Sequence, residues 1–167
     1  MKCHICGEYF PEEIFHKIGI GEKKYGYRNG RDNRCPTCKL NHIRKCRALW
    51  SDEEKLKKLL HYRLLSAKTR ALKKKLDFNL TKEFLIHLWN TQKGKCALTG
   101  LDMTYKIDNG RSHTNVSIDR IDNDKGYTID NVQLVCMAVN QMKSDLTNEE
   151  LIYFCNNIIK WNKKKKK

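Results

Sequence analysis

Long apolar runs are absent from this sequence. The chain has 167 residues, and it contains no run of 18 or more consecutive apolar residues. This excludes a membrane-spanning helix of ordinary length. The start of the chain, Met1 to His4, has no apolar segment of the kind found in signal peptides. We therefore expect a cytoplasmic protein, in whose reducing surroundings the eight cysteines act as metal ligands or buried thiols and not as disulfides.

Acidic and aromatic residues are also scarce. The chain has 19 Asp and Glu against 34 Lys and Arg, a formal net charge of +15, and subtracting the five lysines of 163–167 still leaves +10. This balance favours nucleic acid as a partner, with a merely soluble lysine-rich protein as the alternative. Aromatic residues make up 9% and do not cluster with basic ones, which disfavours an RNA-binding protein that stacks bases.

The first 40 residues contain little continuous apolar sequence but four cysteines. They form two C-x2-C pairs separated by 28 residues, namely Cys3 with Cys6 and Cys35 with Cys38. Each such turn presents two thiolates to one ion, and zinc takes four of them tetrahedrally. Structural zinc contributes about 10–16 kcal/mol of apparent binding free energy, which would offset the missing core. We predict one structural zinc site, with four free thiols or an iron–sulfur cluster as alternatives.

The middle of the chain has helical periodicity. Residues 41–76 carry a leucine stripe, and Ser51 with Glu54 fits a capping box. The other face is almost wholly positive, which favours contacts with phosphate, a solvated face being the alternative. The DNA-binding candidates on this face are Lys68, Arg70, Lys73, Lys74 and Lys75. Thr81 would cap a second helix that ends near Gly94.

Beyond residue 95 the sequence becomes strand-like. We expect strands at 96–100, 116–120 and 132–136, and a short helix at 137–143. Thr147 and Glu150 form a second capping box at the start of a last helix, whose lysine tail beyond Asn162 we expect to fray.

Two polar residues of this region could share a hard cation. Asp119 lies at the end of the strand 116–120, and Asn140 follows 21 positions later on the short helix. A strand–loop–strand–helix unit could bring their oxygens onto one Mg²⁺, which takes few protein ligands beside phosphate oxygens and water. Each residue alone is weak evidence, since a lone Asp usually lies at the surface and a lone Asn in a turn or cap.

The segment 117–143 resembles the ββα-metal motif of HNH endonucleases, especially the phage-type branch. An Asp-Arg strand end with an N-terminal zinc module also resembles a rare-cutting restriction enzyme of that family. The likeness covers residues 95–160 well and 1–45 loosely. It implies an α+β fold in three parts and a tail: a small zinc ribbon (1–45), a basic helical linker (46–94), a ββα-metal nuclease core with flanking helices (95–162), and a Lys tail (163–167).

The resemblance also implies roles for single residues. Asp119 and Asn140 would hold Mg²⁺ or Mn²⁺, and Asn131 would fix the loop between the strands by hydrogen bonds to its backbone. Lys143 would approach a phosphate of the substrate, double-stranded DNA, which would be hydrolysed to 5′-phosphate and 3′-hydroxyl ends. A homodimer that reads a palindrome and a monomer that nicks both remain open.

Arg120 stands where most of the family has its general-base histidine. Because arginine keeps its proton at neutral pH, it can bind the scissile phosphate but cannot act as that base. His113 is the first candidate for the base, and a metal-bound water is an alternative; weaker candidates are Tyr105, Tyr127 and His87. The competing function is a non-catalytic zinc-containing DNA-binding protein on a nuclease fold, which the retained Asp119 and Asn140 disfavour.

Many members of this family build a second zinc site around the ββα unit from two further C-x2-C pairs. Here only Cys96 and Cys136 remain, with Thr99 and Val139 at the partner positions. Two cysteines do not make a structural zinc site. We therefore expect no second zinc and interpret both cysteines as buried thiols of the core.

Overall fold

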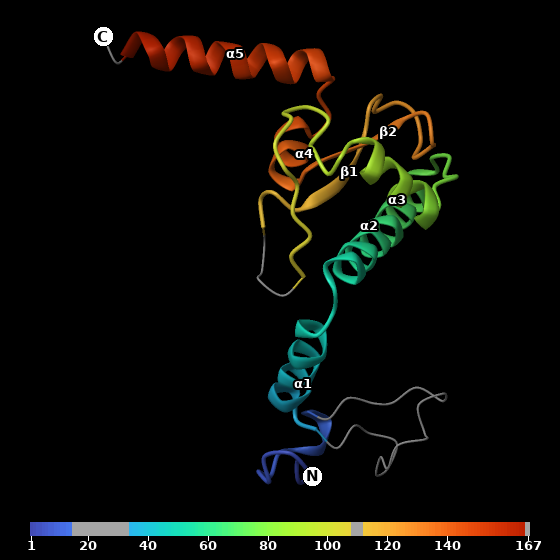
Figure 1. Cartoon of the computed structure of the whole chain (residues 1–167), viewed down its shortest axis with the longest axis vertical. Helices are drawn as coiled ribbons and strands as arrows, with labels where there is room; N and C mark the ends of the chain where they lie inside the picture. Colours follow the sequence, from blue (N-terminus) through green and yellow to red (C-terminus); the bar gives the residue numbers. More distant parts are fainter. Residues whose placement is uncertain (15–33, 108–111, 166–167) are drawn as a thin grey trace. The chain divides into compact units, whose positions relative to one another are not determined.

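The computed structural model describes residues 1–14, 34–107 and 112–165. They belong to two compact units, Met1–Trp50 and Ser51–Lys167 (Figure 1). Helices and one two-stranded sheet together give the α+β class that the sequence predicts. Most of the spacer between the two cysteine pairs lies outside the described residues. In the part of the chain that is described, no helix combines the length and apolar character that a membrane span needs.

The first unit begins with a hairpin and ends with a helix. Lys2 and Tyr9 form an antiparallel bridge, and Gly7 turns the chain between them with φ at +79°. A short 3-10 helix η1 (Glu12–Ile14) follows, and helix α1 spans Pro36–Ala48. Proline at the first position suits a helix start, because it lacks only an N–H that would have no helical partner.

The apolar core formed by the described residues of this unit is very small. Cys3 and Cys35 are its buried members in the described residues, with Met1, Phe10 and Cys38 packed around them. Helix α1 has no buried side chain. A core of this size cannot offset the conformational entropy lost on folding, so the unit needs a further cross-link, as the sequence predicts.

The second unit opens with two capped helices. Helix α2 (Asp52–Lys74) begins at Ser51, whose hydroxyl accepts a hydrogen bond from the Glu54 amide (3.2 Å) while the Glu54 carboxylate accepts one from the Ser51 amide (2.8 Å). The helical segment expected at 41–76 is therefore split into α1 and α2. Helix α3 (Lys82–Thr91) begins at Thr81, which caps it as expected.

The sheet consists of β1 (Val116–Arg120) and β2 (Val132–Cys136), paired antiparallel with Val116 opposite Cys136 and Arg120 opposite Val132. Both strands lie where the sequence predicts them. Successive side chains of a strand point to opposite faces. Val116 and Ile118 join the apolar core that α2 and α3 supply, through residues that include Leu59, Leu60, Ala67, Ala71 and Leu85.

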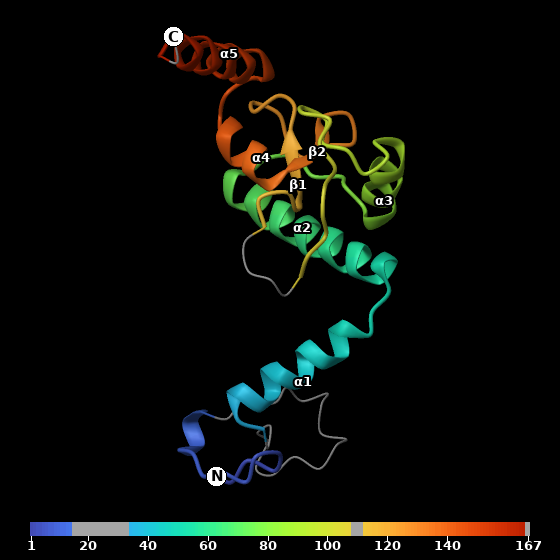
Figure 2. The same ribbon diagram turned by 60° about the vertical axis from the view of Figure 1, so that its left-hand side comes forward.

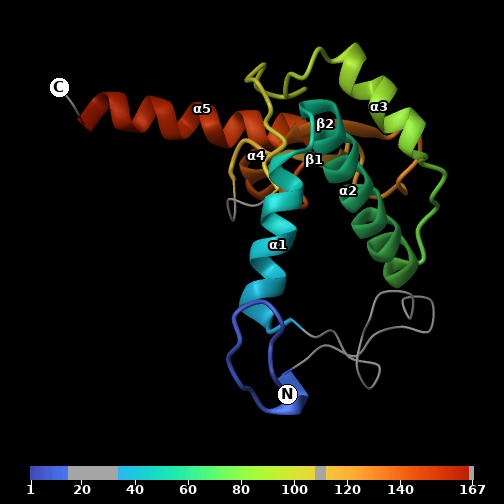
Figure 3. The same ribbon diagram turned by 60° about the horizontal axis from the view of Figure 1, so that its bottom comes forward.

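Helix α4 (Met137–Lys143) follows β2 directly, and α5 (Asn148–Lys165) follows α4 after a short turn. Figures 2 and 3 show the strand pair with α2 on one side and α4 on the other. The capping box of α5 is present, since Thr147 and Glu150 exchange two hydrogen bonds of 2.8 and 3.1 Å. The helix extends beyond Asn162 to Lys165, which corrects the expected frayed tail as far as the chain is described.

The loop between the strands packs on the segment after α2. A Cβ atom on Gly126 would lie 2.3 Å from the backbone oxygen of Asp77, so only glycine fits at this position. The Tyr127 amide donates to the same oxygen (2.8 Å), and Phe78 and Tyr127 form a parallel bridge. These contacts hold the loop against the body of the second unit.

Candidate functional site

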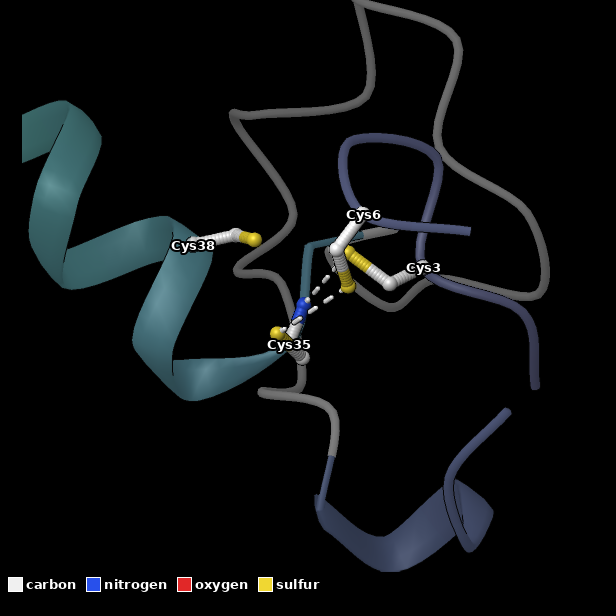
Figure 4. A group of neighbouring side chains, drawn as sticks. All are labelled: Cys3, Cys6, Cys35 and Cys38. Atoms are coloured by element: carbon white, nitrogen blue, oxygen red, sulfur yellow. Dashed lines mark hydrogen bonds between the residues drawn. The ribbon is translucent and has the colours of Figure 1, made fainter. Parts of the chain in front are cut away.

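Four cysteine sulfurs of the first unit lie within 4.8 Å of one another (Figure 4). The Sγ atoms of Cys6 and Cys35 are 4.0 Å apart. A zinc ion with bonds of about 2.3 Å to four sulfurs places those sulfurs about 3.8 Å apart, so the arrangement suits tetrahedral zinc. Cys3, Cys6, Cys35 and Cys38 are thus brought together as the sequence predicts.

The protonation of these thiols also suits a cation. Burial raises the pKa of the Cys3 thiol, but hydrogen bonds from the backbone of Cys6, Cys35 and Ile5 outweigh this and lower that pKa to about 6. Burial, followed by interactions with the other three thiols, raises the pKa of Cys38 to about 12. One thiol therefore ionises readily, whereas another gives up its proton only when a positive charge balances it. Zinc would supply that charge.

The same backbone geometry recurs around Cys96 in the second unit. Cys3 donates its amide to Glu8 (2.9 Å) and accepts from Gly7 (3.0 Å); Cys96 donates to Leu101 and accepts from Gly100, both at 2.9 Å. The bridge Lys95–Asp102 repeats the bridge Lys2–Tyr9. The segment 96–100 is therefore a metal-knuckle turn and not the expected strand.

The helix that completes the knuckle recurs as well. Cys35 precedes α1 and donates its amide to the Cys3 sulfur (3.3 Å), just as Cys136 precedes α4 and donates its amide to the Cys96 sulfur (3.4 Å). Cys96 and Cys136 are each 2% exposed and belong to the core, so they are the buried thiols that the sequence predicts. The second unit keeps the frame of a four-cysteine site with two of the four thiols.

Asp119 lies on β1 and Asn140 on α4, and side-chain hydrogen bonds join these two elements. Asn140 donates its amide nitrogen to the Ser117 hydroxyl (2.7 Å) and to the Ile118 carbonyl (3.1 Å). Asp119 lies two residues after Ser117, on the same face of β1. Since both bonds of Asn140 use its nitrogen, its side-chain oxygen is the atom suited to a cation, as is the Asp119 carboxylate.

Lys143 lies on the carboxylate of Asp119. Its ammonium donates to Asp119 Oδ1 (3.2 Å) and to the Arg120 carbonyl (2.6 Å). Both side chains are buried, with Lys143 0% and Asp119 3% exposed. The expected contact of Lys143 with a DNA phosphate remains a prediction; in this structure its ammonium is buried on Asp119. The ammonium of Lys143 contacts oxygen atoms of the kind that a hard metal ion would also bind.

Two residues that the sequence did not single out hold this site in place. Gln133 lies opposite Asp119 in the strand pair and donates to its Oδ2 (2.9 Å), while Ser117 accepts from Asn140. Their positions could have been found from the pattern, since Ser117 is two residues from Asp119 on one strand and Gln133 is its partner once the register is known.

Arg120 points away from Asp119, as adjacent strand residues must. Its guanidinium donates to the carbonyls of Asn123 (2.7 Å) and Lys125 (2.8 Å) and lies 5.3 Å from the centre of the Tyr127 ring. In the structure it therefore fastens the loop between the strands, and its contact with a phosphate remains a prediction.

Asn131 makes the hydrogen bonds that the resemblance implies. Its oxygen accepts from the Asp122 amide, and its nitrogen donates to the carbonyls of Asp122 and Gly126, all at 2.9 Å. It is 4% exposed. Asn131 and Arg120 together give the loop five contacts from side chain to backbone, so the loop that leads from β1 toward β2 is held in one conformation.

The four candidates for the general base make contacts with residues other than Asp119. His113 is exposed and precedes β1, and its carbonyl accepts from Ala138 at the start of α4, whereas Asp119 lies near the end of β1. Tyr127 accepts from Arg70, Tyr105 packs on Trp89, and His87 lies beside Thr91. The structure brings none of these four side chains to Asp119 among the contacts of the described residues.

The predicted basic face divides into two groups. Arg63 donates to the Val116 carbonyl (2.9 Å), and Arg70 donates to the Tyr127 hydroxyl (2.9 Å) and to Ser66, so both tie α2 to neighbouring residues. The remaining candidates are exposed, namely Lys68, Lys73, Lys74 and Lys75. These four lysines are available to a polyanion.

No family model matches the chain. It is 35% identical over 98 residues to an uncharacterized 29.0 kDa protein from the dda-modA intergenic region of Enterobacteria phage T4, an alignment covering 59% of this chain and 36% of that protein. It is also 35% identical over 88 residues to the uncharacterized protein R423 of Acanthamoeba polyphaga mimivirus, covering 53% of this chain and 14% of that protein. The chain thus spans about a third or less of these relatives.

A solved structure of the rare-cutting HNH restriction endonuclease PacI is also similar to the chain. The two share 16% sequence identity, and the TM-score is 0.42. The comparison covers 95% of this chain and 93% of that chain.

Proposed function

We propose that the chain is a metal-dependent DNA endonuclease of the HNH kind, which hydrolyses phosphodiester bonds to 5′-phosphate and 3′-hydroxyl ends. The observation that carries this proposal is the position of Asp119 and Asn140 on neighbouring elements of a strand–loop–strand–helix unit. A carboxylate and an amide oxygen form a small oxygen set for Mg²⁺ or Mn²⁺, which leaves room for phosphate and water. The bound ion would polarise the phosphate and balance charge on the leaving oxygen.

The chain's own residues would position this site. Gln133 holds the Asp119 carboxylate from the opposite strand, and Ser117 directs the Asn140 amide so that its oxygen turns away from β1. Asn131 and Arg120 keep the loop rigid. The exposed lysines of α2 would contact the DNA backbone, which fixes position on the duplex without reading sequence.

Lys143 favours a second candidate, a non-catalytic zinc-containing DNA-binding protein on the same fold. Its ammonium already neutralises Asp119 in the buried site. If that ion pair persists when DNA is bound, the ammonium competes with a divalent ion for the carboxylate. Both candidates include one structural zinc on the four cysteines of the first unit.

The deciding experiment is cleavage of supercoiled plasmid with Mg²⁺, Mn²⁺ or EDTA by the wild type and by Asn140→Ala. We expect metal-dependent nicking or linearisation, reduced in the variant by at least about 100-fold because a metal ligand is lost. Gln141→Ala is the matched control, since Gln141 is the exposed neighbour of Asn140 on α4. DNA binding without cleavage in either metal would favour the non-catalytic candidate, and equal activity of Asn140→Ala would remove Asn140 from the site.

A further inference from the structure

Helix α5 carries an apolar face that the described chain leaves uncovered. Leu151 near its start is buried, but every later residue through Lys165 is exposed except Cys155, which is half-buried. Figures 1 and 3 show the helix leaving the body of the second unit. Protein helices gain most of their stability by packing an apolar face, so a helix exposed in this way needs a partner.

The apolar residues lie on one side of the helix. Leu151, Phe154, Ile158 and Trp161 are spaced by three, four and three residues, which is the a and d pattern of a coiled coil. Phe154 is 51%, Ile158 59% and Trp161 61% exposed. The same side is widened by Ile152, Cys155 and Ile159.

The charges lie at opposite ends of the helix. Glu149 and Glu150 lie in the first turn, and Lys163, Lys164 and Lys165 lie in the last. A parallel pair of such helices would bring six like charges together at its basic end. An antiparallel pair would instead place the acidic end of each helix beside the basic end of the other, and it also aligns the two helix dipoles favourably.

We propose that α5 is a dimerisation helix that packs antiparallel against α5 of a second copy of this chain. A two-fold axis is the simplest closed arrangement for two identical chains. With that axis near Asn156, Phe154 packs opposite Ile158 of the second copy, and Trp161 packs beside the first turn of that copy's α5. Glu150 and Lys164 then flank the seam from opposite copies, and the two Cys155 thiols lie close to the axis.

The contact area of this dimer can be estimated from the exposed side chains of α5. Burying the exposed parts of five large side chains on both copies would remove on the order of 1,000 Å² of surface from water, near the lower limit for a specific interface. The association is therefore expected to be concentration-dependent. The proposal rests on α5 alone and does not depend on nuclease activity.

Sedimentation velocity of the full chain with zinc, measured over a series of protein concentrations, tests the proposal. The wild type shifts from monomer to dimer, and Phe154→Ser weakens the association at least about tenfold, because it removes a central aromatic anchor. Leu72→Ser is the matched control: Leu72 is also a large apolar residue, is 71% exposed and lies on α2, away from the proposed interface. Both substitutions lie on exposed positions, and circular dichroism verifies that each variant is folded.

Disulfide formation tests the orientation. Under mild oxidation the wild type forms a covalent dimer that Cys155→Ser abolishes and Cys46→Ser retains, although Cys46 is the more exposed thiol. In the Cys155→Ser background, Asn162→Cys forms no self cross-link, because an antiparallel pair separates the two copies of residue 162. A monomer at every concentration overturns the proposal, whether or not the helix then binds DNA or anionic vesicles. Efficient cross-linking at 162 overturns the antiparallel arrangement.

Discussion

Single residues decide what the site of the second unit can bind. Asp119 and Lys143 are both almost completely buried, and the ammonium contacts the carboxylate at 3.2 Å. Removing one partner of a buried ion pair leaves a charge without compensation, which is far more costly than losing an exposed pair. Loss of Lys143 alone should therefore be costly, and with Lys143 in place the ion pair occupies a carboxylate that the proposed metal ion would use.

We predict that Lys143→Met destabilises the second unit by about 3–5 kcal/mol in EDTA, since Asp119 is left unpaired. Mn²⁺ should restore part of that loss by binding to the freed carboxylate, and Asp119→Asn in the same chain should restore it without metal. Urea unfolding with and without Mn²⁺ measures both effects. Lys125→Met is the control, because Lys125 pairs with Asp122 at the surface and its loss should cost less than about 1 kcal/mol. Equal stability of the Lys143→Met and Lys125→Met variants would contradict the buried-pair interpretation.

At the scale of elements, the hairpin before β1 and the start of α4 repeat the frame of the N-terminal cysteine site. The turn, the bridge and the amide-to-sulfur hydrogen bond all recur. Thr99 and Val139 occupy the positions that correspond to Cys6 and Cys38. The apolar core around Cys96 and Cys136, which includes Val116 and Leu134, now supplies the stability that a metal would otherwise supply.

We predict that Thr99→Cys with Val139→Cys creates a second zinc site in the second unit, because the frame already directs both positions toward Cys96 and Cys136. Metal analysis should find two zinc ions per chain in the purified variant and one per chain in the wild type. The single variant Thr99→Cys is the control, since three thiols leave the tetrahedral set incomplete. One zinc ion in both proteins would mean that the recurring backbone frame does not direct these side chains together.

At the scale of the whole molecule, the two units are stabilised in different ways. The first has a described core of a few residues around Cys3 and Cys35, whereas the second has a core of 15 buried residues. Only the first should therefore depend on metal. The compositional difference is already visible along the chain, since half of the cysteines lie in the first 40 residues.

We predict that a zinc chelator unfolds the first unit and leaves the second folded. Hydrogen exchange followed by mass spectrometry should show loss of protection in 1–50, while β1, β2 and α2 stay protected. Acidification should have the same effect, because zinc binds thiolates and protons compete for them. In the metal-free site the pKa of Cys38 is raised to about 12, so zinc must displace a proton there. The affinity for zinc should therefore rise with pH. Unchanged protection of both units in the chelator would contradict a structural zinc.

Features governed by nearby residues could be predicted from the sequence alone. The two strands, the helix at 137–143 and the capping residues Ser51, Thr81 and Thr147 all depend on short spacing, and the structure has them where expected. The four-cysteine cluster could be predicted because each C-x2-C pair is itself a local motif. The packing of α2 and α3 could not be predicted in the same way. Their apolar residues join one core with those of the strands, so these helices lie in the compact unit Ser51–Lys167.

The direction and environment of single side chains were decided only by the tertiary structure. Lys143 looks like a surface lysine until α4 packs on β1 and buries it on Asp119, 24 residues earlier in the chain. Arg120 turns to the loop because strand residues alternate, and the exposure of α5 depends on what the rest of the chain leaves unpacked. Spacing along a sequence sets local geometry, whereas burial, which controls charge and binding, depends on contacts between distant segments.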